Sequence, residues 1–121
     1  MLTVGFIGNG KSANRYHIPF ILQKSDKIKI KMIYTRKHSR DVWDEIPGVI
    51  YTEDLQELLN DQEVQVIIIS TPSQSHYELA KTVLNAGKNC VVEKPFTETL
   101  EEAKELYTLA KQKGVMIQCY Q

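Results

Sequence analysis

The sequence lacks an excess of charge of one sign, and it lacks a long hydrophobic run. Lys plus Arg and Asp plus Glu both number 15 in the 121 residues, so no overall field draws the chain to nucleic acid or to an anionic membrane. The longest aliphatic run, Val66 to Ile69, is far too short to span a bilayer, and no basic, apolar leader opens the sequence. These absences predict a soluble cytoplasmic protein that meets any anionic ligand through a local site.

Cysteine is also scarce, with only Cys90 and Cys119. Both stand in apolar, strand-like contexts without metal-ligand spacing, and two cysteines make no disulfide framework in a chain of this size. We expect buried free thiols and no metal site. The sequence shows no internal repeat, low-complexity tract or interdomain linker, so residues 1–121 are predicted to form one domain.

A glycine turn near the start is the first positive signal. Val4, Phe6 and Ile7 predict a buried strand, and Gly8-Asn9-Gly10 follows it, with Ala13 three residues later. This is the Gly-x-Gly-x-x-Ala form of the dinucleotide fingerprint, whose small residues permit a tight turn, a close pyrophosphate and close helix packing. The N–H groups at the start of the next helix would face the pyrophosphate. Similar glycine pairs occur in ordinary turns, so the rest of the chain must decide between a site and a plain loop.

Strand and helix patterns alternate after this turn. Apolar patterns predict further strands over 28–34, 49–51, 64–69, 90–92 and 115–120. Such alternation is typical of a parallel sheet with right-handed crossovers. With the glycine turn after the first strand, it predicts an α/β, Rossmann-type doubly wound fold: a mainly parallel six-stranded sheet in the order 3-2-1-4-5-6 with helices on both faces.

Proline, glycine and capping residues predict where the helices begin and end. A helix from Lys11 to Arg15 should break near Tyr16 to Pro19, and a second turn should run from Ile18 to Gln23. Thr99 and Glu102 have capping-box spacing. The remaining expectations are a helical turn over 41–46, a helix capped by Thr52 or Asp54 and ending near Asn60, one from about Gln74 or Ser75 to Ala86 closed by Gly87, and one closed by Gly114 with Leu100, Ala103, Leu106, Tyr107 and Ala110 facing inward.

Four stretches follow predicted strands and should meet at the carboxyl edge of the sheet, where open parallel sheets bind ligands. They are Gly8 to Ser12, Thr35 to Lys37, Thr71 to His76, and Glu93-Lys94-Pro95. Their convergence from distant parts of the sequence favours a nucleotide site more strongly than any one of them does.

The same residues carry a family resemblance. Gly8-Asn9-Gly10-Lys11-Ser12-Ala13, Thr71-Pro72-Ser73 with His76, and the specific Glu93-Lys94-Pro95 together resemble the Gfo/Idh/MocA oxidoreductases, and the match covers essentially the whole chain. The resemblance implies a nicotinamide-dependent oxidoreductase that transfers hydride between the cofactor and a sugar, cyclitol or related polyol.

The resemblance also implies roles for individual residues. Lys94 would be the catalytic residue, contacting the reacting hydroxyl and the nicotinamide side of the cofactor, and a cationic amine there can stabilise alkoxide charge and pass a proton. Glu93 would orient Lys94 or the ribose. The full set expected to bind the cofactor is Gly8, Asn9, Gly10, Lys11, Ser12, Thr35, Arg36, Lys37, Thr71, Pro72, Ser73, His76, Glu93 and Lys94.

The residues after the second strand favour NADP over NAD. A carboxylate at that position would bind both ribose hydroxyls and repel a 2′-phosphate, whereas an arginine accommodates the phosphate. Here the sequence reads Thr35-Arg36-Lys37, with no acid before Asp41. NAD remains possible if this stretch is only a solvated basic loop.

Other readings of the same residues stay open. Glu93 and Lys94 could form a plain surface pair, His76 could lie on a helix surface, and Tyr16 and His17 could belong to core and loop. The fold could also serve a non-catalytic nucleotide sensor or a binder of S-adenosylmethionine.

One departure from the family pattern concerns the substrate. Such enzymes carry a second α/β domain that supplies most of the substrate pocket, and residues 1–121 contain none. We expect an isolated cofactor-binding half that binds cofactor but turns over substrate poorly. The carboxyl side of the sixth strand and neighbouring apolar groups should be left partly uncovered, which favours self-association as a homo-oligomer.

Overall fold

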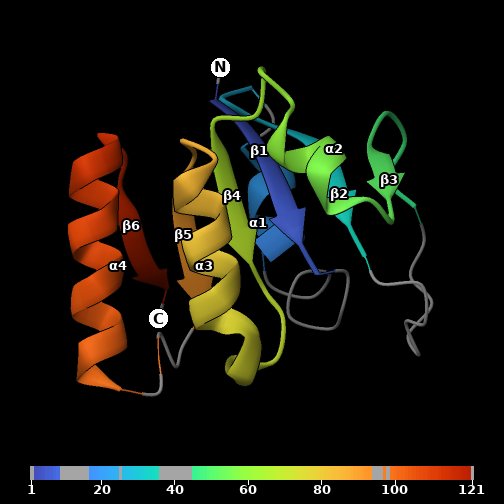
Figure 1. Ribbon diagram of the computed structural model, residues 1–121. Helices are drawn as coiled ribbons and strands as arrows, with labels where there is room; N and C mark the ends of the chain where they lie inside the picture. The colour runs from blue at the N-terminus through green and yellow to red at the C-terminus, as the bar shows by residue number, and fades with distance from the viewer. Residues whose placement is uncertain are drawn as a thin grey trace.

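The computed structural model describes residues 2–8, 17–24, 26–35, 45–93, 97 and 99–120. Within them, six strands form one sheet in the order β3-β2-β1-β4-β5-β6, and each neighbouring pair is parallel. Figure 1 shows the arrowheads pointing to one edge. The predicted order is confirmed. The strands are β1 (Leu2–Ile7), β2 (Ile28–Tyr34), β3 (Ile50–Thr52), β4 (Val66–Ile69), β5 (Asn89–Glu93) and β6 (Ile117–Tyr120).

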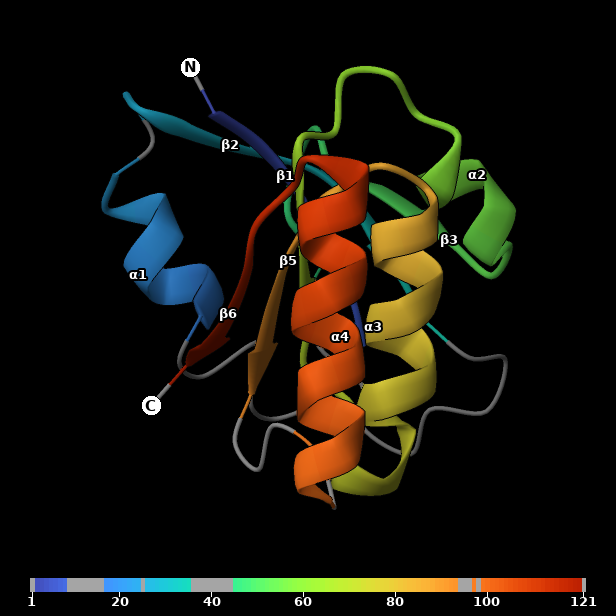
Figure 2. The same ribbon diagram turned by 60° about the vertical axis from the view of Figure 1, so that its left-hand side comes forward.

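Helices cover both faces of the sheet. α3 (His76–Asn85) and α4 (Leu100–Lys113) pack side by side, and α3 packs on β4 and β5. The short α2 (Leu55–Leu59) lies against β2 and β3. α1 (Ile18–Leu22) lies on the opposite face, where it contacts β2 (Figure 2). The chain is therefore doubly wound, as predicted.

The hydrophobic core consists of two clusters, one on each face of the sheet. The larger cluster joins apolar residues of β1, β4 and β5 to α2, α3 and α4, with Ile67, Leu84 and Leu106 fully buried. The smaller cluster lies under α1 and contains Phe6, Ile33 and the less buried Ile68. The run Val66 to Ile69 feeds both clusters because alternate side chains of a central strand point to opposite faces.

The predicted helix ends agree with the structure at several residues. Asp54 caps α2 by accepting a hydrogen bond from the N–H of Gln56 at 3.0 Å, so Asp54 rather than Thr52 is the cap. Thr99 accepts from the N–H of Glu102 at 3.1 Å. Gly114 ends α4 with a φ of 69°, a value that glycine adopts without strain.

Two expectations were wrong in detail. Leu100 and Tyr107 do not face inward, being 71% and 54% exposed. They lie roughly 100–120° around α4 from Leu106, at the flank of the buried stripe. Cys90 is buried, and burial raises its pKa to about 12, but Cys119 is only half-buried. The expected helix over 11–15 and most of the turn over 41–46 lie outside the described residues.

Candidate functional site

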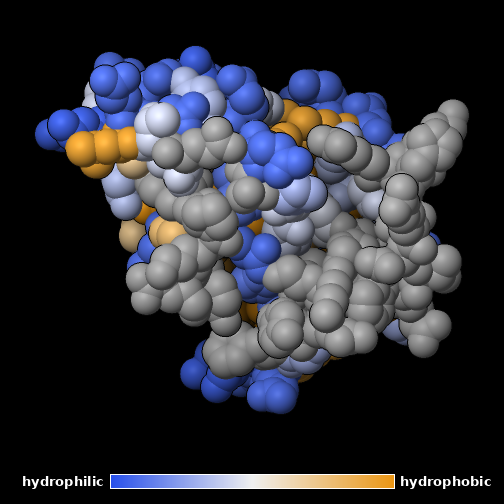
Figure 3. All heavy atoms as spheres, turned by 90° about the horizontal axis from the view of Figure 1, so that it is seen from below, coloured by the Kyte–Doolittle hydropathy of each residue, from blue (hydrophilic) through white to orange (hydrophobic). Residues whose placement is uncertain are grey.

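Four of the predicted site positions lie together at the carboxyl edge of the sheet. Gly8 follows β1, Thr35 follows β2, Thr71 comes shortly after β4, and Glu93 is the last residue of β5. Since these strands are parallel neighbours, their ends meet on one side of the molecule. Figure 3 views the molecule from this side, with hydrophilic described side chains in blue along its margin.

Gly8 stands at the point where the strand order reverses. Its N–H donates to the carbonyl of Tyr34 at 2.9 Å, while the N–H of Ser70 donates to the carbonyl of Ile7 at 3.0 Å. The φ of Gly8 is +110°, and a Cβ there would lie 2.9 Å from the Ser70 carbonyl oxygen. No side chain fits this turn without strain, which is the property that the fingerprint requires of its first glycine.

Thr35 ties the end of β2 to the end of β3. Its N–H donates to the carbonyl of Thr52 at 2.9 Å, and the residue is half-buried. The backbone is therefore anchored immediately before the basic stretch that begins at Arg36.

The turn after β4 is closed by hydroxyl groups. Ser75 Oγ donates to the carbonyl of Pro72 at 2.7 Å, which uses its single proton, so Thr71 Oγ1 donates to Ser75 Oγ at 2.6 Å. A short 3-10 helix, η2 (Ser73–Ser75), leads from this turn into α3. Thr71 is half-buried and Pro72 is exposed at the surface.

His76 also hydrogen-bonds to the turn after β4. It is 1% exposed, and its Nε2 lies 2.7 Å from the carbonyl oxygen of Thr71. A carbonyl only accepts, so Nε2 carries the proton. The alternative of a helix-surface histidine is therefore wrong: His76 is a buried group that shapes the turn.

Glu93 has a partner that the sequence patterns did not reveal. His17 Nε2 lies 2.8 Å from Glu93 Oε1, across 76 positions of sequence, with His17 6% and the Glu93 side chain 18% exposed. Glu93 is therefore more than an exposed surface residue, and its expected pairing with Lys94 lies outside the described residues. In the sequence, only the presence of His17 shortly after the glycine turn hinted at such a partner. Spacing along the chain cannot show that His17 contacts the end of a strand 76 positions away.

Several predicted site residues lie outside the described part of the chain. They are Asn9, Gly10, Lys11, Ser12, Arg36, Lys37 and Lys94. Among the described residues, no group of three His, Cys, Asp or Glu side chains could hold a metal ion.

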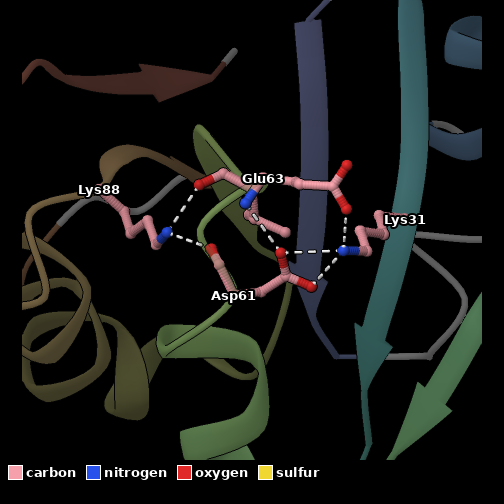
Figure 4. Close-up of polar contacts among 5 residues, drawn as sticks. Lys31, Asp61, Glu63 and Lys88 are labelled. Carbon is pink, nitrogen blue, oxygen red and sulfur yellow. Dashed lines mark hydrogen bonds and ion pairs between the residues drawn. The ribbon is translucent and has the colours of Figure 1, made fainter.

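The opposite end of the molecule holds a different polar cluster. Lys31 Nζ lies 2.7 Å from Asp61 Oδ2 and also pairs with Glu63, while Lys88 Nζ donates to the carbonyls of Asp61 and Val64 (Figure 4). Beside it lies an open hollow of about 660 Å³ at the amino ends of β4 and β5, lined in part by Gln65 and Lys88. Ligands of open parallel sheets bind at the other end of the strands. We therefore read this cluster as a structural link that holds the segment from Asp61 to Val64 against Lys31 and Lys88, and not as the candidate site.

Comparison with known proteins now decides the family. The model of the oxidoreductase family with an NAD-binding Rossmann fold, Gfo/Idh/MocA, matches residues 2–121. This chain belongs to that family. The resemblance carried by Gly8-Asn9-Gly10, Thr71-Pro72-Ser73 and Glu93-Lys94-Pro95 is thereby confirmed.

Individual relatives are similar over the whole chain. The oxidoreductase YhhX of Escherichia coli is 44% identical over 100% of this chain and 35% of its own length. An oxidoreductase from Bacillus cereus of known structure superimposes with a TM-score of 0.89 at 50% identity, covering 100% of this chain and 35% of its own. The scyllo-inositol 2-dehydrogenase (NADP(+)) IolW of Bacillus subtilis is 35% identical, over 98% of this chain and 33% of its own.

These Gfo/Idh/MocA relatives are oxidoreductases, and the chain spans about a third of their length, at the amino-terminal side. The family and the fold establish an oxidoreductase NAD(P)-binding Rossmann domain. No helix among the described residues is long and apolar enough to cross a membrane.

Proposed function

We propose that this chain is the cofactor-binding part of an NADP-preferring dehydrogenase that acts on a sugar, cyclitol or related polyol. One observation carries the proposal: Gly8, Thr35, Thr71 and Glu93 converge at the carboxyl edge, on both sides of the switch between β1 and β4. In this fold each half of a dinucleotide lies on one side of that switch.

The described residues fit a dinucleotide. Gly8 keeps the turn after β1 free of a side chain. On the other side of the switch, hydrogen bonds of Thr71 and Ser75 fix the conformation of the turn after β4. A bound nicotinamide ring would supply hydride acceptance or donation. We assign the remaining cofactor contacts to Asn9, Gly10, Lys11, Ser12, Arg36 and Lys37.

Lys94 is proposed as the catalytic residue. Its ammonium group would stabilise negative charge that develops on the reacting oxygen and would pass a proton to or from it. Glu93, at the end of β5, would orient Lys94 or the nicotinamide ribose.

The substrate class rests on more general support. The relatives are about three times as long as this chain, and one of them is named as a scyllo-inositol dehydrogenase. We propose that a further domain supplies the substrate pocket, so that residues 1–121 bind cofactor and the complete protein binds the polyol.

The cofactor preference follows from charge. Thr35-Arg36-Lys37 offers a hydroxyl and two cations, and an arginine makes forked contacts with a phosphate. One charge-assisted hydrogen bond contributes about 1.5–3 kcal/mol, so two contacts would favour NADPH by about a hundredfold or more.

Calorimetry on the 121-residue chain tests this proposal. NADPH should bind more tightly than NADH at moderate salt, and Arg36→Ala should remove most of the difference. Lys104→Ala, an exposed cation on α4, is the matched control and should change neither affinity. Equal affinities for the two cofactors in the unsubstituted chain would refute the NADP assignment, and binding of neither would refute the function.

A further inference from the structure

The contact between His17 and Glu93 links parts of the sheet that are not neighbours. His17 directly precedes α1, and its ring packs at a tilt against Phe6 of β1, with the ring centroids 6.2 Å apart. Glu93 ends β5, and β4 lies between β1 and β5 in the sheet. The imidazole therefore reaches past the end of β4 and joins the two halves of the fold.

The chemistry of the pair defines its protonation. An ionised carboxylate only accepts hydrogen bonds, so His17 Nε2 carries the proton that lies 2.8 Å from Glu93 Oε1. Both side chains are largely shielded from water. Removal of the donor would take this anchor away from a shielded carboxylate, which would then reorient towards other donors or towards water.

Stability alone does not account for such a pair. Replacement of both partners of a buried hydrogen bond by apolar groups of the same shape can be nearly neutral for stability. What the pair does provide is orientation, because it fixes the side chain of Glu93 at the end of β5, the first residue of Glu93-Lys94-Pro95.

We propose that His17 is a positioning residue for the nicotinamide half of the cofactor site. It holds the Glu93 carboxylate at the end of β5, on the side of the switch opposite to the adenosine half at β2. His17 itself contacts neither reacting group. This inference rests on the proposed function, since it presupposes that a dinucleotide binds at this edge.

Comparison of two ligands distinguishes a positioning role of His17 from a general role in stability. NADPH carries both halves of the cofactor, whereas 2′-phospho-ADP has the same adenosine half and pyrophosphate but lacks both the nicotinamide and its ribose. In the 121-residue chain, His17→Leu should weaken NADPH binding about tenfold, the equivalent of one hydrogen bond to a charged group. Binding of 2′-phospho-ADP should be unchanged.

Further variants sharpen the test. His17→Gln places an N–H donor near the position of Nε2 and should restore most of the NADPH affinity, while His17→Asn is too short and should not. Lys31→Gln breaks a comparable long-range polar link at the other end of the sheet and should leave both affinities unchanged. Should His17→Leu fail to fold, judged by circular dichroism, His17→Asn gives the same comparison.

The outcomes are distinct. A selective loss of NADPH binding that glutamine restores supports the positioning role. Equal losses for both ligands, or no loss for either, overturn it while the proposed function stands. If the unsubstituted chain binds neither ligand, the proposed function fails and the positioning role fails with it.

Discussion

At the scale of single residues, Gly8 is a position where backbone geometry restricts the sequence to glycine. Gly8→Ala must place a Cβ 2.9 Å from a backbone oxygen at a φ of +110°. We expect a loss of roughly 2–4 kcal/mol in the free energy of unfolding, because strain and a backbone clash add. Urea unfolding measures it, and cofactor binding should fall as well.

Gly48 provides the matched control for this substitution. Its φ is +84°, but nothing lies within 4 Å of its Cβ position. Gly48→Ala should therefore cost only about 1 kcal/mol, the strain of the backbone alone. A Gly8→Ala variant no less stable than Gly48→Ala would contradict the close packing of the β1 turn against Ser70.

The ion pair between Lys31 and Asp61 predicts how stability depends on pH. Burial raises the pKa of Asp61, but the hydrogen bonds from Lys31 and from the N–H of Glu63 outweigh it and hold this pKa below the ordinary 3.8. A carboxyl with a depressed pKa stabilises the fold above its unfolded value and loses that contribution as pH falls through the folded value. Stability should therefore drop as pH is lowered from about 5 to about 2.

Asp61→Asn keeps the shape of the side chain and removes its charge. The urea midpoint of this variant should change less with pH over the acid range than that of the unsubstituted chain. Lys31→Gln should flatten the same dependence, because the pair needs both partners. If neither substitution reduced the acid dependence, carboxyl groups elsewhere would be its source.

At the scale of elements, α4 shows how local signals mark the ends of a helix. Thr99→Ala removes the side-chain oxygen that accepts from the N–H of Glu102. The expected cost is about 1 kcal/mol, a lowering of the melting temperature by about 4 °C. Thr108→Ala, exposed within the same helix, should be neutral or slightly stabilising. Equal melting temperatures for the two variants would show that the cap contributes nothing.

Helix faces were harder to predict than helix ends. Thr99 and Gly114 act through neighbours within a few residues, so the sequence carries the whole signal. The orientation of α4 depends on α3 and β6, against which it packs. Leu100 and Tyr107 were therefore assigned to the core although they lie at its flank.

At the scale of the whole molecule, the two faces of the sheet are covered unequally. α3 and α4 lie over β4, β5 and β6 on one face. On the other face, α1 is the only described helix, and it packs on β2 (Figure 2). Val66 and Val91 on this face are only half-buried. Apolar groups left uncovered in this way commonly lie at interfaces.

We therefore expect the 121-residue chain to self-associate through β4 and β5 at high concentration. Light scattering should show a mean mass above that of the monomer, and Val91→Lys should lower it because a charge is costly to bury. Lys104→Glu, on the exposed side of α4, should have little effect. A monodisperse monomer at every concentration would contradict the expectation.

Much of this protein follows from its sequence alone. The β-branched run from Val66 to Ile69, the glycine turn at Gly8 and the alternation of strand and helix predict the strand order, because periodicity and turn chemistry are local properties. The same signals bring Thr35, Thr71 and Glu93 to one edge, since parallel strands end together. Family membership rests on these motifs too.

Only the tertiary structure decided what those residues contact. His17 and Glu93 are 76 positions apart, and neither lies in a pattern that pairs it with the other. Likewise, His76 is a surface or a buried group according to how α3 is rotated against the sheet, and its bond to Thr71 follows from that rotation. Such contacts depend on packing across the sheet, where distance in space is independent of distance along the chain.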